Sequence, residues 1–129
     1  MDQKKVVIVT GGSMGIGRAI ADRFANDGAD VVIADIAGAA EAANEMVAAG
    51  ASAIGVTCDI SDPVSCDAMV LAAVNAFGRI DTLVNNAGLY STLKLTDFSK
   101  IKPEDWQRVL NVNVMGQAFV TAAVLPTMQ

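Results

Sequence analysis

The sequence VVIVTGGSMGIG, residues 6–17, predicts a buried strand that turns directly into a helix. A short, continuous run of branched apolar residues is typical of a strand with both faces covered. The segment that follows has the apolar spacing of a helix, at Ile16, Ile20 and Phe24. Between the two lies a glycine-rich turn, which lets backbone N–H groups approach a phosphate at the N-terminus of the helix. The stretch therefore predicts the first strand–helix unit of an α/β fold, with an anion-binding turn.

The same strand-then-helix pattern recurs along the chain. Apolar runs predict further strands at 31–34, 53–56 and 80–84, and helical spacing follows each of them. A glycine suited to a helix C-terminus ends each of the first three helices, at Gly28, Gly50 and Gly78. Two prolines stand where a first helical turn is expected, Pro63 and Pro103.

Repeated units of this kind predict an α/β protein with a parallel sheet, helices on both faces and right-handed crossovers. We expect a Rossmann-like, doubly wound sheet with strand order 3-2-1-4, in one dinucleotide-binding domain over residues 1–129. The last helix is expected to begin near Pro103 and to be interrupted by Pro126, and no fifth strand follows it. The expected fold is therefore incomplete, with its later strands absent from this chain.

Composition excludes several classes of function. The chain has 9 Lys and Arg, 14 Asp and Glu and no His, so its net charge is −5. Without His it cannot build a Ser-His-Asp triad or a His-ligated zinc site. Two cysteines, Cys58 and Cys66, are too few for a disulfide framework or a four-thiolate metal site. The acidic balance argues against a nucleic-acid-binding surface.

The apolar segments are short. The longest, 114–125, is broken by Gly116, Gln117 and Thr121 and falls below the length of a membrane span. The apolar run near the N-terminus is too short for a signal peptide. We therefore expect a cytoplasmic protein with reduced, buried thiols, no metal, and neither a nucleic-acid nor a membrane partner.

Polar or glycine residues follow each predicted strand. Asp35 ends the second strand, Asp59 follows the third, and Asn85-Asn86-Ala87-Gly88 follow the fourth. The carboxyl ends of parallel strands meet at one rim of the sheet, where open α/β sheets bind ligands. Each residue has a structural explanation as well, as a helix cap or part of a turn. Together with the glycine turn after the first strand, these make four such strand ends, which favour a binding rim. Asp35 is placed there to accept hydrogen bonds from a ribose.

The glycines of the turn have separate expected roles. Gly11 makes the tight turn, Gly15 permits close approach of the backbone to a pyrophosphate, and Gly17 lets the helix pack against the sheet. Their spacing, Gly-x3-Gly-x-Gly, differs from the commoner Gly-x-Gly-x-x-Gly fingerprint.

These motifs resemble the N-terminal half of a short-chain dehydrogenase/reductase. The matching segments occur in the order of that family over the whole chain: TGGSMGIG at 10–17, Asp35, CDI at 58–60, NNAG at 85–88 and NVNVMG at 111–116.

The resemblance implies a role for each matched position. The pyrophosphate and nicotinamide ribose would be contacted by Ser13, Met14 and Ile16. The adenosine ribose would be held by Asp35 and Ile36, and the adenine by Asp59 and Ile60. The cofactor beneath the fourth strand would be lined by Asn86, Ala87 and Gly88. Asn113 would be the asparagine of the catalytic tetrad, which helps to position a water of the proton relay.

The family's catalytic Ser, Tyr and Lys follow a fifth strand and are therefore absent from this chain. Tyr90-Ser91-Thr92-Leu93-Lys94 has the spacing of the family's Tyr-x-x-x-Lys. It falls in an expected loop, however, and a spacing of four brings two side chains together only on a helix. We therefore reject Tyr90 as the proton donor and expect 89–100 to form one wall of the substrate entrance. The 129-residue chain alone is expected to be inactive, with Asn113 as its catalytic residue.

The leading hypothesis is an NAD-dependent oxidoreductase that transfers a hydride between its nicotinamide and a secondary alcohol or ketone. The resemblance implies NAD as cofactor, a small-molecule substrate, and a homo-oligomer, tetramer or dimer, for the complete protein. One alternative is a dinucleotide-binding sensor or pseudoenzyme without turnover. Another is an NADPH-dependent 3-oxoacyl-carrier-protein reductase. Asp35 and the lack of a basic residue at Met14 and Ile36 weigh against this second alternative.

Overall fold

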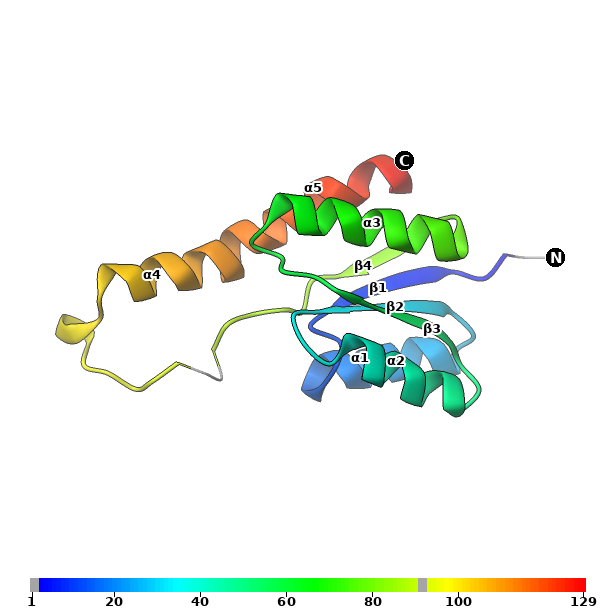
Figure 1. Cartoon of the computed structure of the whole chain (residues 1–129), viewed down its shortest axis with the longest axis horizontal. Coiled ribbons are helices and arrows are strands. Elements are labelled where there is room, and N and C mark those ends of the chain that lie inside the picture. The colour runs from blue at the N-terminus through cyan, green and yellow to red at the C-terminus, as the bar shows by residue number, and fades with distance from the viewer. Residues whose placement is uncertain (1–2, 91–92) are drawn as a thin grey trace.

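A computed structural model describes residues 3–90 and 93–129 and shows a parallel sheet between two layers of helices (Figure 1). The strands are ordered β3-β2-β1-β4, all parallel. Their bounds are β1 (Val6–Thr10), β2 (Asp30–Asp35), β3 (Ser52–Thr57) and β4 (Thr82–Val84). The predicted fold class and strand order are confirmed.

Helices cover both faces of the sheet. One layer holds α1 (Gly15–Asn26) and α2 (Ala39–Ala48), and the other holds α3 (Pro63–Phe77) and α5 (Gln117–Met128), as Figure 1 shows. Between β4 and α5 the chain passes through η1 (Phe98–Lys100), α4 (Pro103–Leu110) and a π-helical stretch, η2 (Asn111–Gly116). The two prolines expected at helix starts are confirmed, because Pro63 and Pro103 are the first residues of α3 and α4.

The first four residues of β1 are apolar because their side chains alternate between two cores. Val6 and Ile8 belong to the core beneath α3 and α5, whereas Val7 and Val9 belong to the core beneath α1 and α2. All four are at most 1% exposed. A strand with two covered faces has no solvent side to carry polar residues, which explains the continuous apolar run.

Both cysteines lie in the core, as expected. Cys58 follows β3 and Cys66 is on α3, and both are buried and unpaired by a disulfide. Burial raises the pKa of the Cys66 thiol to about 12 and also raises the pKa of Cys58. Both thiols are therefore protonated at neutral pH and act as small apolar packing groups.

The start of β4 differs from the expectation. The predicted strand at 80–84 is observed only as Thr82–Val84, with Ile80 buried ahead of it. Ahead of the strand, hydrogen bonds of Asp81 continue the pairing of β4 with β1. Its N–H donates to the carbonyl oxygen of Val6 at 2.9 Å, and its Oδ2 accepts from the N–H of Val6 at 2.8 Å.

The last helix also differs, because it is not a continuous α-helix. The π-helical η2 separates α4 from α5, and Pro126 lies inside α5 instead of ending it. The whole segment, Pro103–Met128, has 26 residues, and an 18-residue window within it has a mean hydropathy of 1.4, which by length and composition is enough to cross a membrane. The expectation of a shorter apolar stretch was therefore wrong on length. In this fold the α5 part of the segment packs on α3, and its Val120 and Val124 are buried.

Asp81→Ala is expected to lower the free energy of unfolding by about 1–3 kcal/mol, because it leaves the buried N–H of Val6 without a partner. The Arg79 guanidinium, which donates to Asp81 Oδ1 at 2.6 Å, lowers the pKa of that carboxyl, and the N–H of Val6 adds to the effect. The stabilisation is thus complete above the ordinary value of 3.8 and is lost as the pH falls through the lowered pKa.

Urea unfolding at neutral and acid pH measures this difference. Asp97→Ala is the matched control, because Asp97 and its partner Lys100 are 77% and 74% exposed and such pairs contribute about 0–1 kcal/mol. Equal losses for the two variants, or a loss for Asp81→Ala that does not shrink in acid, would contradict this role of Asp81.

Candidate functional site

The residues predicted at the strand ends meet at one rim of the sheet. The glycine turn follows β1, Asp35 ends β2, and the segment 85–88 follows β4. β1 lies between β2 and β4, so the turn has Asp35 on one side and the Asn-rich segment on the other. The boundary between β1 and β4 is also where the chain changes from one face of the sheet to the other. Open α/β sheets bind their ligands at such a switch point.

The glycines of the turn are needed for two physical reasons. Gly11 and Gly15 have φ of 66° and 59°, a backbone conformation that other residues adopt only with strain. A Cβ at Gly17 would overlap the carbonyl oxygen of Gly11 and the side-chain nitrogen of Asn86, whereas a Cβ at Gly15 would meet nothing within 4 Å. Gly17 therefore packs closely on the glycine turn and on Asn86, and its predicted packing against the sheet itself stays a prediction. Gly15 has the open space beside its backbone that its predicted role requires.

The first turn of α1 is open to an anion. α1 begins at Gly15. Among the described residues, the side chain of the N-cap residue, Met14, makes no hydrogen bond to the N–H groups of the first turn, and that turn contains no acidic residue. The positive end of the helix dipole lies at the same place. Backbone N–H groups and helix dipole thus fit the phosphates of a dinucleotide.

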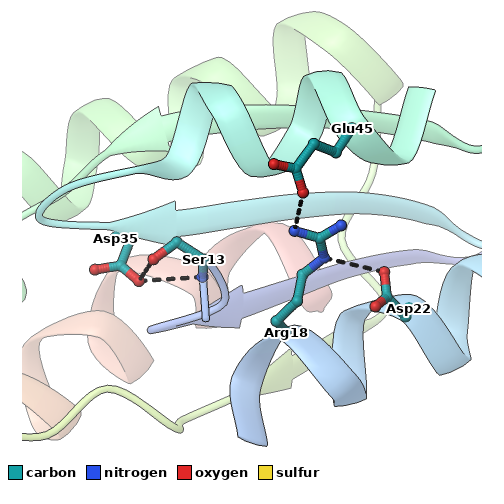
Figure 2. Close-up of polar contacts among 5 residues, drawn as sticks. All are labelled: Ser13, Arg18, Asp22, Asp35 and Glu45. Atoms are coloured by element: carbon teal, nitrogen blue, oxygen red, sulfur yellow. Dashed lines mark hydrogen bonds and ion pairs between the residues drawn. The ribbon is translucent and has the colours of Figure 1, made fainter. Parts of the chain in front are cut away.

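Asp35 is held against the glycine turn (Figure 2). Its Oδ2 accepts from the N–H of Ser13 at 3.1 Å and from the Ser13 hydroxyl at 2.5 Å. Its Oδ1 accepts from the N–H of Ile36 at 2.8 Å. The carboxylate is therefore fixed beside the turn, where a ribose bound next to the phosphates would meet it.

Apolar side chains stand exposed around this turn. Met14, Ile16 and Ile36 are 74%, 71% and 70% exposed. Side chains of this size gain free energy when a flat ring system covers them. A dinucleotide fits the open turn, the fixed carboxylate and these uncovered side chains together.

A buried hydroxyl joins the turn to the segment after β4. Thr10 is 0% exposed, and its Oγ1 donates to the carbonyl oxygen of Val84 at 3.3 Å. The same oxygen accepts from the N–H of Asn86 at 3.0 Å and of Ala87 at 3.1 Å. Sequence reasoning missed Thr10, although a polar residue at the end of an apolar strand was a signal for it.

Asn86 and Asn113 hold backbone groups at the rim. Asn86 Nδ2 donates to the carbonyl oxygen of Gly11 at 3.1 Å. Asn113, within η2, accepts from the N–H of Leu89 at 2.6 Å and donates to the carbonyl oxygen of Leu89 at 3.1 Å. The side chain of Asn113 thus fixes the chain beyond Gly88. Its catalytic role stays a prediction.

Two predicted site residues, Asp59 and Ile60, follow β3 at the same rim. One is exposed and the other is buried. Asp59 is exposed, and its Oδ1 accepts from the N–H of Ser61 at 3.0 Å and from the Ser61 hydroxyl at 2.7 Å. Ile60 is only 5% exposed and packs against Gly116 of η2, where a Cβ would lie 2.7 Å from Ile60 Cδ1. The side chain of Ile60 therefore belongs to the core, and the predicted adenine contacts of both residues stay predictions.

Tyr90 and Lys94 lie in a loop, as predicted. Neither is in a helix, and Tyr90 is 70% exposed. Ser91 and Thr92 of this Tyr-x-x-x-Lys match lie outside the described residues. The helical geometry that would bring a Tyr and a Lys together is therefore not formed by Tyr90 and Lys94.

Arg18 is a charged residue near the turn that sequence reasoning missed. Figure 2 shows its guanidinium between Asp22 of α1, at 3.1 Å, and Glu45 of α2, at 2.9 Å. The hydrogen bonds to Glu45 and then Asp22 raise the pKa of Arg18. The positive charge of Arg18 is thus paired with the carboxylates of Asp22 and Glu45, between α1 and α2.

A model of the short chain dehydrogenase family matches residues 5–129. The chain belongs to this family. An uncharacterized oxidoreductase of Methylorubrum extorquens is 43% identical over 122 residues, which are 92% of this chain and 48% of that protein.

Two solved structures share the fold of this chain. One, from Burkholderia phymatum in complex with NAD, has a TM-score of 0.90 and 36% identity over 98% of this chain and 44% of its own. A 3-ketoacyl-(acyl-carrier-protein) reductase of Brucella melitensis complexed with NADH has a TM-score of 0.88 and 40% identity over 97% of this chain and 50% of its own. This chain therefore spans about half the length of these relatives.

Gly17→Ala is expected to lower the free energy of unfolding by about 1–3 kcal/mol or more, because its Cβ meets backbone that cannot move aside. Gly15→Ala is the matched control, with the strain of a positive φ, about 1–2 kcal/mol, but no overlap. Urea unfolding of the two variants compares them. A smaller loss for Gly17→Ala than for Gly15→Ala would show that the turn is not packed as described.

Proposed function

We propose that this chain provides the NAD-binding part of a short-chain dehydrogenase that interconverts a secondary alcohol and a ketone. The observation that carries the proposal is the Asp35 carboxylate, fixed by Ser13 beside an open glycine turn. Bound NAD would supply the hydride acceptor. Asp35 would bind the adenosine ribose, the first turn of α1 would hold the phosphates, and the segment 86–88 would line the nicotinamide side.

NAD is proposed over NADP on electrostatic grounds. A carboxylate can accept hydrogen bonds from both ribose hydroxyls, whereas a 2′-phosphate would remove one donor and add about two negative charges. Met14 and Ile36 carry no charge, and Arg18 is already paired with Asp22 and Glu45. The surroundings of Asp35 therefore offer little to offset the repulsion.

Asn113 supports an enzyme over a binding module without turnover. It matches the asparagine of the family's catalytic tetrad, which helps to position a water of the proton relay, and a sensor that binds only the dinucleotide would not need a proton relay. Reduction of a 3-oxoacyl carrier protein is a second candidate, favoured by the likeness to the Brucella melitensis reductase.

The proposal extends to assembly and location. Large apolar side chains are exposed along α4, η2 and α5, among them Trp106, Leu110, Val114 and Leu125. Such a face supports a homo-oligomer for the complete protein. The buried, reduced thiols support a cytoplasmic location.

Titration of the chain with NAD and NADP tests the cofactor proposal. NAD is expected to bind roughly ten- to a hundredfold more tightly, because one charge-assisted hydrogen bond is worth about 1.5–3 kcal/mol. Asp35→Ala should weaken NAD binding and narrow the difference, and Asp35→Ala with Ile36→Arg should reverse it. Asp27→Ala, at the far end of α1, is the control and should change neither affinity. Equal affinities for NAD and NADP in the unaltered chain would refute the proposed role of Asp35.

A further inference from the structure

A glutamine next to the π-helical turn contacts the segment that lines the proposed cofactor site. Gln117 is the first residue of α5, and its Nε2 donates to the carbonyl oxygen of Ala87 at 2.5 Å. Its Oε1 is buried and has no hydrogen-bond partner among the described residues. A buried acceptor without a partner destabilises a fold by about 1–3 kcal/mol. An apolar side chain of equal size would avoid that loss, so the bond from Nε2 is the specific contribution of this side chain.

Gln117 and Asn113 hold the chain on either side of one glycine. Gln117 binds the carbonyl of Ala87, and Asn113 binds both backbone groups of Leu89. Gly88 lies between these two attachments, and its backbone has more conformational freedom than that of any other residue type. The Ala87–Gly88 peptide can therefore hold one orientation only if its neighbours are fastened.

The same helix fastens the start of this segment. Asn85 Nδ2 donates to Thr121 Oγ1 at 3.1 Å, and that hydroxyl donates to the backbone carbonyl of Gln117 at 2.8 Å. From the other side, Thr10 binds the N–H groups of Asn86 and Ala87. Hydrogen bonds thus hold the segment 85–89 from two sides. Thr10, at the start of the glycine turn, binds it on one side, and η2 and α5 bind it on the other.

We propose that Gln117 is a positioning residue: its bond to the Ala87 carbonyl orients the Ala87–Gly88 peptide and thereby sets the affinity for the nicotinamide dinucleotide. The inference rests on the proposed function, since it assigns a determinant of affinity to the same site. Gln117 acts through the backbone of Ala87 and Gly88 and does not itself touch the reacting atoms.

Hydrogen exchange of the unliganded chain tests the orientation. Gln117→Met keeps the length of the side chain and removes both the donor and the unpaired acceptor. The N–H groups of Ala87 and Leu89 are expected to exchange roughly three- to tenfold faster, as the loss of one hydrogen bond implies. Global stability should stay level or rise, because the unpaired Oε1 is gone. A purely structural role predicts the opposite, lower stability with no selective loosening.

Two further variants separate hydrogen bonding from volume. Gln117→Glu is nearly isosteric, but its carboxylate cannot donate and faces the Ala87 carbonyl, so it should loosen the segment more than Gln117→Met. Gln107→Met, on α4, is the matched control. Gln107 is exposed, and within 3–90 and 93–129 its Nε2 binds only Asn111 Oδ1, at 2.7 Å, so exchange at Ala87 and Leu89 should not change.

NAD titration tests the consequence for binding. Gln117→Met and Gln117→Glu are expected to weaken NAD binding by about three- to tenfold, in the same order as their exchange rates, and Gln107→Met should bind as the unaltered chain does. Unchanged exchange in both Gln117 variants, or faster exchange with unchanged NAD affinity, overturns the inference. Failure of the unaltered chain to bind NAD would overturn the proposed function, while exchange at Ala87 and Leu89 would still decide whether Gln117 orients the segment.

Discussion

The hydroxyl of Thr10 is the contact on which the site depends. It is fully buried, and it donates one hydrogen bond to β4 and accepts two from the segment that follows. A buried hydroxyl with all three interactions formed is stabilising, whereas a partly satisfied one is costly. Because Thr10 immediately precedes the glycine turn, this oxygen and the bond from Asn86 Nδ2 to the Gly11 carbonyl oxygen together set the separation between the turn and the segment 85–88.

Side-chain hydrogen bonds flank the pairing of β1 with β4 at both ends, because the backbone ladder between these strands is short. Only three residue pairs join these strands, Val7 to Thr82 through Val9 to Val84, whereas β1 and β2 share five. Asp81 binds Val6 at one end of the short ladder and Thr10 binds Val84 at the other. Side-chain hydrogen bonds thus extend a ladder whose backbone bonds are few, at the boundary where the ligand is proposed to bind.

Charge and helix geometry complete the site from opposite sides. On the β2 side, Asp35 is turned toward Ser13, and Arg18 is neutralised by Asp22 and Glu45. On the β4 side, Asn113 and Gln117 lie at η2 and the start of α5, and both contact the segment 87–89. Gly116, the last residue of η2, packs closely on Ile60 because it carries no Cβ.

Local pattern was enough to predict the fold class, the strand order and most of the rim. Continuous apolar runs, glycines after helices and an acidic strand end each report their own immediate environment, so they can be read without knowing the rest of the chain. The pairing of Asp81 with Val6, the three bonds of Thr10 and the ion pairs of Arg18 join residues up to 77 positions apart, and nothing in the local sequence marks such partners. The π-helical turn and the contact of Gln117 with Ala87 were likewise decided by tertiary packing, because apolar spacing along 103–128 fits one continuous helix equally well.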